Sequence, residues 1–203
     1  MAMISSPRPL ILASQSAARQ HMLRQAGVDF SIQKSALNED DLREKLMQSM
    51  TAPETMALAL AQAKALSVAH DNPDAAVIGA DQILHYNGKI FNKARNIDEA
   101  KANLSMLSGK QHGLISAVCV VQGGKSVWHH IEKSRLSMRV LSPAAIDVYA
   151  ARAGGVLTEC VGGYALEGLG AWLFDSVDGD FFTILGMPLI PLLHHLRTHG
   201  QGF

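Results

Sequence analysis

The sequence predicts an α/β protein whose sheet contains both parallel and antiparallel strands. Short apolar runs alternate along the chain with longer segments of helical periodicity, and this alternation is typical of α/β folds. Two glycine turns, Asn87-Gly88 and Gly123-Gly124, each separate two strand-like runs, which is the pattern of a β-hairpin. Because hairpins join antiparallel strands, we expect a mixed sheet rather than a purely parallel one.

The first strand and helix are predicted close to the N-terminus. Residues 10–13 are a short apolar run, and Ser16 is a good N-cap for a helix that continues to about Ala26. Gly27 then stands at the position where a glycine commonly follows the last helical turn. This strand-to-helix turn exposes unpaired backbone N–H groups, which is a local structure that favours anions.

The next segments predict a short strand over 29–33 and a charged, loosely helical stretch over 38–50. Pro53 begins a longer predicted helix that reaches His70, since proline is favoured in the first turn. Lys64 lies in the middle of an apolar part of this helix. It either extends to solvent from a half-buried face or binds an anion, and the pattern leaves both interpretations open.

The most informative strand is the apolar run over 75–80, which continues past Asp81 to Tyr86. Six consecutive apolar residues predict a strand buried on both faces. A carboxylate directly after them needs a partner, because burying it unpaired is costly. A magnesium ion, a general-base role or an internal salt bridge would each supply one. Ligands of open α/β sheets collect at the carboxyl ends of such strands.

The second half of the chain continues the alternation. In order, it predicts a helix from Asn96 to before Gly109, strands over 114–122 and 126–140, a helix between Ser142 and Gly154, a strand near 172–177, and a helix after Pro188. Neither a repeat nor a linker-like composition interrupts the sequence. We therefore expect residues 1–203 to form one domain.

Composition and charge exclude several classes of protein. Eighteen basic and eighteen acidic residues give a formal net charge of zero, whereas a duplex-binding protein needs a basic surface. The chain has only eleven aromatic residues for base stacking, so an RNA-binding role is disfavoured as well. A few local cations still suffice for one small anionic ligand. We expect no nucleic-acid partner.

Cysteine usage and the N-terminus point to the cytoplasm. Cys119 and Cys160 are too few and too far apart for a disulfide framework or a zinc ribbon, and we expect buried thiols in a reducing compartment. The apolar N-terminus is interrupted by Pro9 and by polar residues, unlike a signal peptide. No apolar run has the length of a membrane span, so we expect no membrane partner.

Several charged and hydroxyl side chains are candidates for an anion site. Ser14, Ser16 and Arg19 share the first strand-to-helix turn, although an ordinary capped helix with a solvent arginine has the same pattern. Glu39 lies in an acidic cluster that also suits a solvated helix start. Lys93 follows the first hairpin and either folds back toward Asp81 or stays in solvent.

Other catalytic patterns are absent from the sequence. It contains no H-E-x-x-H, G-x-S-x-G, P-loop or G-x-G-x-x-G motif, and its histidines have no metal-ligand spacing tied to an acidic partner. Protease, lipase and dinucleotide-binding functions therefore lose their support.

Eight segments, taken in order, resemble the motifs of one family. Residues 13–19 (A-S-Q-S-A-A-R) resemble A-S-x-S-P-R-R, residues 38–39 resemble its D-E pair, residues 64–65 its K-A, residues 77–82 its strand ending in G-A-D, and residues 90–93 its I-x-x-K. Residues 107–112 resemble L-S-G-x-x-H, residues 164–170 resemble Y-x-x-x-G-L-G, and residues 179–180 with 185–189 resemble the closing G-D and G-L-P-L motifs. Together they resemble the Maf family of nucleoside triphosphate pyrophosphatases, over roughly residues 9–197.

The resemblance implies a fold and an activity. The fold is a mixed, elongated, twisted sheet flanked by helices, with two lobes and a central cleft, similar to inosine triphosphatases. The activity is hydrolysis between the α- and β-phosphates of a nucleoside triphosphate, which removes non-standard nucleotides and has been linked to septum formation. The alternative is a nucleotide-binding regulator of cell division without turnover. A homodimer is left open.

The resemblance also implies roles for the candidate residues. Asp81 would be the catalytic proton acceptor, and Glu39 and Asp81 would hold a divalent cation, Mg²⁺ or Mn²⁺. The residues that would bind the phosphates are Ser14, Ser16, Arg19, Lys64 and Lys93.

Three positions correspond to those that select the base. Gln82 and Glu167 are similar to the branch that acts on 7-methyl-GTP, since the branch for thymidine and uridine triphosphates has threonine and glutamine there. Ala18 stands where one branch has arginine and the other tryptophan, so it matches neither. The sequence also departs from the family at Ala17 and Ala94, where proline is usual.

Overall fold

The computed structural model describes residues 8–200, which divide into two compact units. Within the described chain, unit 1 comprises residues 8–81, 116–132 and 186–200, and unit 2 comprises residues 82–115 and 133–185. The strands are β1 (Leu10–Leu12), β2 (Ser31–Ile32), β3 (Ala76–Tyr86), β4 (Lys89–Phe91), β5 (Gln111–Gln122), β6 (Lys125–Met138) and β7 (Phe174–Asp178). The helices are α1 (Ala17–Gln25), α2 (Glu39–Gln48), α3 (Pro53–Asp71), α4 (Ile97–Leu107), α5 (Pro143–Ala153), α6 (Val156–Glu159), α7 (Phe181–Ile184) and α8 (Leu189–Thr198), with 3-10 turns η1 (Val161–Gly163) and η2 (Leu169–Leu173).

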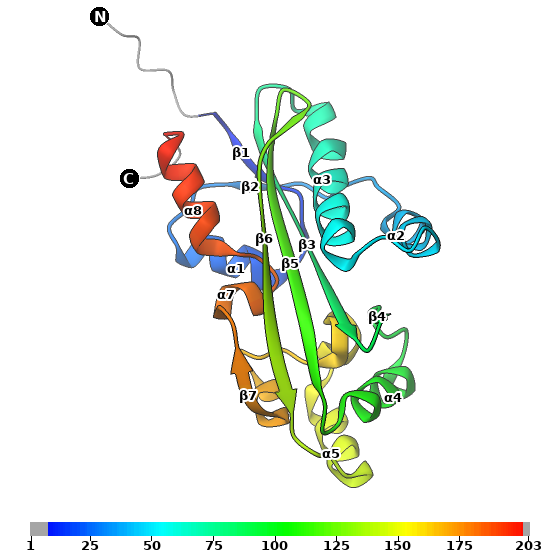
Figure 1. Ribbon diagram of the computed structural model, residues 1–203. Helices are drawn as coiled ribbons and strands as arrows, with labels where there is room; N and C mark the ends of the chain where they lie inside the picture. Colours follow the sequence, from blue (N-terminus) through cyan, green and yellow to red (C-terminus); the bar gives the residue numbers. More distant parts are fainter. Residues whose placement is uncertain (1–7, 201–203) are drawn as a thin grey trace, which may run out of the picture. The chain divides into compact units, whose positions relative to one another are not determined.

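The strands form a seven-stranded mixed sheet in the order β2-β1-β3-β5-β6-β7, with β4 paired to β3. Strand β1 runs parallel to both β2 and β3, whereas β4 and β7 are antiparallel to their partners. The prediction of an α/β fold with a mixed sheet flanked by helices is therefore confirmed (Figure 1). The predicted cleft, and the prediction of a single domain, stay predictions.

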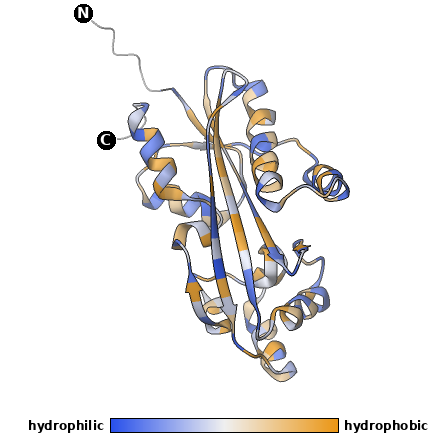
Figure 2. Ribbon diagram, viewed as in Figure 1, coloured by the Kyte–Doolittle hydropathy of each residue, from blue (hydrophilic) through white to orange (hydrophobic). Residues whose placement is uncertain are grey.

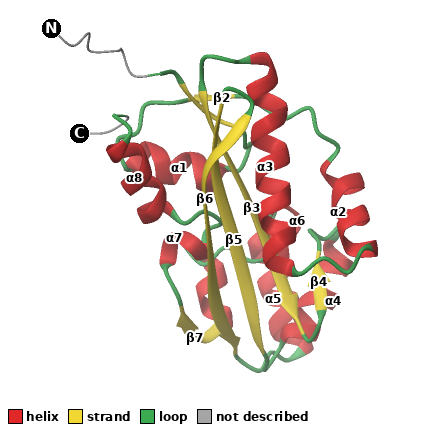
Figure 3. Ribbon diagram, turned by 45° about the horizontal axis from the view of Figure 1, so that its top comes forward, coloured by secondary structure: helices red, strands yellow, loops and turns green. Residues whose placement is uncertain are grey.

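In unit 1, helices α1 and α8 lie on one side of the strands and α3 lies on the other (Figure 3). Helix α3 approaches β3 closely at Gly79, where any Cβ would overlap the Ala61 carbonyl oxygen. Small residues on both elements permit this contact. The buried face of α3 is made mostly of alanine, leucine and methionine, and Lys64 is the one charged residue on it.

Helix α2 packs beside α3 but buries none of its residues. Asn38 caps it, because the side-chain oxygen of Asn38 accepts from the Asp41 N–H at 3.4 Å. Figure 2 shows the contrast between this helix, which is mostly hydrophilic, and the long hydrophobic stretches of the strands. The ion pairs that Glu39 and Arg43 make with Lys64 and Asp81 therefore help to hold α2 in place.

Unit 2 has its own hydrophobic core, which the end of β3 and helices α4 and α5 enclose. Its most buried large side chains include Leu84, Leu104, Leu107, Leu114, Leu136 and Leu157. The turn between β3 and β4 has positive φ at both Asn87 (47°) and Gly88 (75°), as a type I′ hairpin requires. The hairpin predicted from this dipeptide is confirmed.

The differences from the sequence prediction lie in the last third of the chain. The strand predicted near 172–177 begins only at Phe174, because residues 169–173 form the 3-10 turn η2. The short elements α6, η1 and α7 were not predicted, since three or four residues are too few to show a helical period. Over residues 8–200, no helix is long and apolar enough to cross a membrane.

Candidate active site

The N-terminus of α1 holds the two predicted serines. Ser16 caps the helix, and its Oγ accepts from the Arg19 N–H at 3.5 Å. The Ser14 Oγ accepts from the Ser16 N–H at 3.3 Å and from Arg19 Nη1 at 3.2 Å. Because both hydroxyls act as acceptors in these bonds, each keeps its own proton for donation to a ligand.

Arg19 is buried and held by main-chain oxygens. Its Nε donates to the Gly186 carbonyl at 2.9 Å, and its Nη1 donates to the Ala80 carbonyl at 3.0 Å. Burial lowers the pKa of Arg19, while Asp81 and Glu39 oppose that shift, and a guanidinium stays charged in any case. Nη2 donates to none of the described residues, so its two protons are left for an anion.

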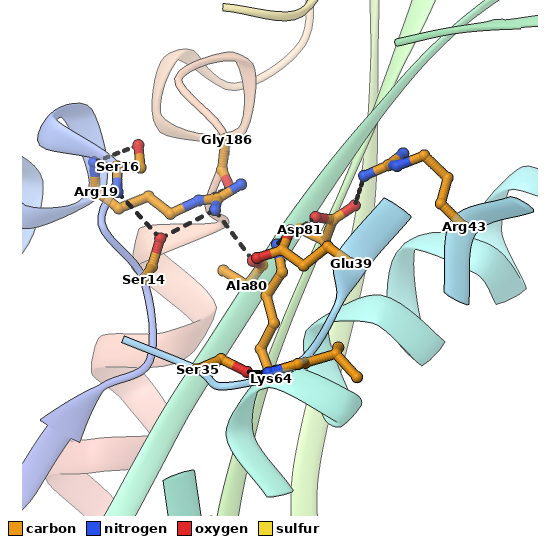
Figure 4. Close-up of polar contacts among 11 residues, drawn as sticks. Ser14, Ser16, Arg19, Ser35, Glu39, Arg43, Lys64, Ala80, Asp81 and Gly186 are labelled. Atoms are coloured by element: carbon orange, nitrogen blue, oxygen red, sulfur yellow. Dashed lines mark hydrogen bonds and ion pairs between the residues drawn. The ribbon is translucent and has the colours of Figure 1, made fainter. Parts of the chain in front are cut away.

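A second group of charges is centred on Lys64 (Figure 4). The Lys64 ammonium lies 2.7 Å from Glu39 Oε2 and 2.7 Å from Asp81 Oδ1. Lys64 and Asp81 are 6% and 3% exposed, so this pair is shielded from water, whereas Glu39 is only half-buried. Of the two interpretations of Lys64, solvent extension is excluded, because the ammonium is buried against two carboxylates.

Arg43 is the residue of this group that sequence reasoning missed. Its Nη2 donates to Asp81 Oδ2 at 3.3 Å, from a position one helical turn after Glu39 on α2. The i, i+4 spacing places both side chains on the same helix face. The spacing from Glu39 was the one sequence signal that could have indicated Arg43. It was not specific, because charged helix surfaces contain many pairs with this spacing.

The cluster has a net positive charge. Arg19, Arg43 and Lys64 carry three positive charges, and Glu39 and Asp81 carry two negative ones. The balance of one positive charge, next to a helix N-terminus, attracts an anion. A triphosphate brings enough negative charge to accommodate further cations as well.

The residues fit a divalent cation that binds together with substrate phosphates. Glu39 and Asp81 supply hard oxygens, and both already approach one cation, the Lys64 ammonium. In residues 8–200, no group of three or more His, Cys, Asp or Glu side chains forms a metal cage. One or two carboxylates completed by phosphate oxygens is the usual arrangement for magnesium.

Two of the three predicted base-selecting residues, Gln82 and Glu167, belong to unit 2, as does Lys93. The Gln82 side-chain nitrogen donates to the main-chain carbonyls of Thr183 (3.1 Å) and Ile184 (2.9 Å). Both of its amide protons are used in this way.

Glu167 and Lys93 are exposed, and both act on the Cys160 thiol. Burial is the main cause that raises the pKa of Cys160. Glu167 raises it further, and Lys93 lowers it. Cys119 is buried and burial raises its pKa to about 12, so both cysteines are protonated thiols. Ala18, the third selectivity position, lies on α1 and is half-buried.

The structure thus gathers six of the predicted residues in unit 1: Ser14, Ser16, Arg19, Glu39, Lys64 and Asp81. Hydroxyls at a helix N-terminus, three cations and two carboxylates beside an α/β sheet make an arrangement that can bind a phosphorylated ligand.

Comparison with known proteins gives the family. The family described as "Maf-like protein" matches residues 9–199. The chain is 44% identical to a nucleoside triphosphate pyrophosphatase of Rhodopseudomonas palustris, covering 94% of this chain and 93% of that protein. It is 42% identical to a 7-methyl-GTP pyrophosphatase of Brucella abortus, covering 93% and 94%. It is 45% identical to a nucleoside triphosphate pyrophosphatase of Caulobacter vibrioides, covering 95% and 96%. The chain belongs to the Maf family.

A solved structure of a nucleoside-triphosphatase / dITP/XTP pyrophosphatase from Mycobacterium abscessus matches more weakly. It is 17% identical, with a TM-score of 0.34 over 64% of this chain and 72% of that one.

Proposed function

We propose that this protein is a nucleoside triphosphate pyrophosphatase, which hydrolyses the bond between the α- and β-phosphates. The observation that carries the proposal is the Lys64 cluster, where a buried ammonium contacts both acidic side chains at 2.7 Å. Family membership supports it, and the relatives named above are pyrophosphatases of nucleoside triphosphates or of 7-methyl-GTP.

The phosphates would be held by charge and by hydroxyl donors. Ser14 and Ser16 each have a proton left to donate, and Arg19 has its Nη2. Lys64, now shared between two carboxylates, would bind phosphate oxygen with the same ammonium. We propose Lys93 as a further phosphate ligand. Charge-assisted hydrogen bonds of this kind are about twice as strong as neutral ones.

Asp81 would be the proton acceptor. A triphosphate competes for Lys64 and Arg43, and their departure leaves the Asp81 carboxylate able to accept a proton from water. The water oxygen then forms a bond to the α-phosphorus. The bond from the α-phosphorus to the bridging oxygen breaks, and its electron pair leaves with pyrophosphate. The products are a nucleoside monophosphate and pyrophosphate.

Glu39 and Asp81 would hold Mg²⁺ or Mn²⁺ together with the phosphate oxygens. When bound, the metal neutralises phosphate charge and so stabilises the charge that develops on the leaving group. The role of these two side chains is to place hard oxygen ligands next to the cations of the cluster.

For the base, we propose a preference for purines and above all for 7-methylguanine. Glu167 is exposed. A carboxylate attracts a positively charged, methylated ring. Its two oxygens also suit the N1–H and amino donors of guanine, whereas thymine offers a single N3–H. Gln82 would also contact the base, and Ala18 would leave space beside it.

We place the protein in the cytoplasm, where its two thiols stay reduced, with a small-molecule triphosphate as partner. A nucleic-acid partner does not suit its neutral charge. A homodimer and a link to septum formation belong to the proposal as well, and neither carries the argument for the activity.

The test is hydrolysis of four triphosphates, dTTP, UTP, GTP and 7-methyl-GTP, followed by pyrophosphate release. With Mg²⁺ or Mn²⁺ we expect turnover that excess EDTA abolishes, with 7-methyl-GTP as the best substrate. Calcium should support less activity, because its looser coordination fits the octahedral phosphate complex poorly. Nucleotide binding without any turnover would instead support the alternative of a non-catalytic regulator.

A further inference from the structure

The segment that carries Glu167, residues 164–170, is a compact loop in unit 2. The Gly168 N–H donates to the Ala165 carbonyl at 3.2 Å. Gly170 packs so closely on Ala165 that a Cβ at position 170 would overlap its main chain. Because Ala165 and Gly170 are in contact, the loop is compact, and a residue that anchors it helps to determine where Glu167 lies.

That anchor is Tyr164, which is 5% exposed at the start of the loop. Its hydroxyl is 2.6 Å from Nε2 of His112 on β5. The Tyr164 ring also packs edge-on against Phe174, with ring centres 4.8 Å apart. The His112 ring centre lies 5.7 Å from that of Tyr164 and 5.8 Å from that of Phe174, so the Phe174 ring packs against both partners of the hydrogen bond.

Both partners of this bond are neutral. His112 is 2% exposed, and burial, helped by the nearby His85, lowers its pKa to about 4. Burial also raises the pKa of Tyr164. A hydrogen bond between two neutral groups in a buried aromatic environment is directional. Leaving either group there without its hydrogen-bond partner costs free energy.

We propose that His112 is a positioning residue for base selection: through its hydrogen bond to Tyr164 it holds the 164–170 loop, and hence Glu167, in the orientation that discriminates between bases. This inference rests on the proposed function, because it assigns Glu167 to the base. It needs no contact between His112 and the nucleotide. Its consequence is that breaking the bond changes substrate preference more than it changes the rate on a good substrate.

The test uses Tyr164→Phe, which removes a single oxygen atom, and His112→Phe, which removes the same bond from the other side. The readout is the ratio of kcat/KM for 7-methyl-GTP to that for UTP, with kcat for each substrate measured separately. We expect each variant to change this ratio by about fivefold or more and kcat on the better substrate by less than about twofold.

Two controls separate positioning from a general loss of stability. His112→Gln keeps a group that can bond to the Tyr164 hydroxyl, and its ratio should stay nearer to wild type than that of His112→Phe. Ser108→Ala removes two other hydrogen bonds of unit 2, one from the Leu141 N–H (2.7 Å) and one to the Leu141 carbonyl (3.3 Å), and should leave the ratio unchanged. Thermal unfolding of every variant identifies any that fail to fold, and the remaining variants decide the question.

The outcomes are distinguishable from those for the activity itself. A wild-type protein that hydrolyses none of the triphosphates overturns the proposed function. If the wild type turns over but Tyr164→Phe and His112→Phe keep the wild-type ratio within about twofold, the positioning role is wrong and the pyrophosphatase proposal stands. A ratio that changes as much in Ser108→Ala also overturns the positioning role.

Discussion

The two units differ in how they hold the residues proposed to act on a nucleotide. In unit 1, charged side chains contact one another directly, with Lys64 at 2.7 Å from two carboxylates and Arg43 at 3.3 Å from Asp81. In unit 2, Glu167 is exposed on a loop that a neutral pair, His112 and Tyr164, anchors from the core. Charged side chains that would touch the phosphates suit a reaction step. A neutral pair that only positions another side chain suits discrimination between similar ligands. Changes to the charged cluster of unit 1 should therefore affect the rate, and changes at Glu167 or its anchor in unit 2 should affect the preference.

The largest effect is expected for Asp81→Asn. The substitution removes the proposed proton acceptor and one metal ligand at once, so kcat should fall by about a thousandfold or more. The fold should persist, because Lys64 keeps Glu39 as a partner. Steady-state kinetics measure the fall in kcat, and thermal unfolding shows whether the fold persists.

Asp178→Asn is the matched control for that variant. Asp178 also belongs to an ion pair, at 2.8 Å from Arg135, but this pair is exposed and joins β6 to β7 in unit 2. Its activity should equal that of the wild type. An Asp81→Asn enzyme with more than about a tenth of the wild-type rate would falsify the assignment of Asp81.

The next effect is acid sensitivity of the fold, and it originates in unit 2. Burial holds the pKa of His112 at about 4, against 6.5 for a free imidazole. Between pH 6.5 and pH 4, His112 therefore binds a proton in the unfolded chain but not in the folded chain. The neutral, buried His112 contributes about 3 kcal/mol to the free energy of unfolding. This contribution is complete above pH 6.5 and is lost as the pH falls toward 4.

Denaturant unfolding of wild type and His112→Phe at pH 7 and at pH 4.5 measures this contribution. The variant should lose clearly less stability than the wild type between the two pH values. Identical losses in the two proteins would show that His112 is not the group responsible.

A smaller effect is expected for Glu167→Gln, which removes the charge and keeps the shape. The preference for 7-methyl-GTP over UTP should fall by about tenfold, the loss that corresponds to about 1.4 kcal/mol. Glu159→Gln is the control, because Glu159 is also an exposed carboxylate of unit 2 that acts on Cys160. An unchanged preference in Glu167→Gln would remove Glu167 from base recognition.

The smallest effect is expected for Arg43→Gln. Its single hydrogen bond to Asp81 is long, and α2 buries no residue, so stability should change by less than about 1 kcal/mol. We expect Arg43 to pair with Asp81 only until substrate binds. In that case the KM of the variant should rise modestly, while its kcat stays close to that of the wild type. A large drop in kcat would instead place Arg43 in the chemistry.

The same contrast explains how much the sequence could predict. Strand β3 and the burial of Asp81 follow from a six-residue apolar run, and the hairpin after it follows from Asn87-Gly88. Lys64 was ambiguous, because a lysine in an apolar helix has two explanations until its partners are known. Its contacts with Glu39 and Asp81 bring together three separate parts of unit 1, and such long-range pairs have no local signal.

Unit 2 was harder to predict for a related reason. The elements α6, η1 and η2 are only three to five residues long, too short for a periodic pattern. Nothing local connects His112 to Tyr164, fifty-two residues later, because the motif that contains each residue does not indicate its partner. Charged residues are recognisable as candidates by type, whereas a neutral buried pair becomes visible only with its partner.

The most direct test of the central claim is product analysis with Mg²⁺ in water enriched in heavy oxygen, using the four triphosphates named above. We expect equal amounts of nucleoside monophosphate and pyrophosphate, with the heavy oxygen on the monophosphate, because water attacks the α-phosphorus. We also expect that Asp81→Asn forms neither product at a comparable rate. A diphosphate with orthophosphate, heavy oxygen in the pyrophosphate, or no turnover of any of the four would contradict it.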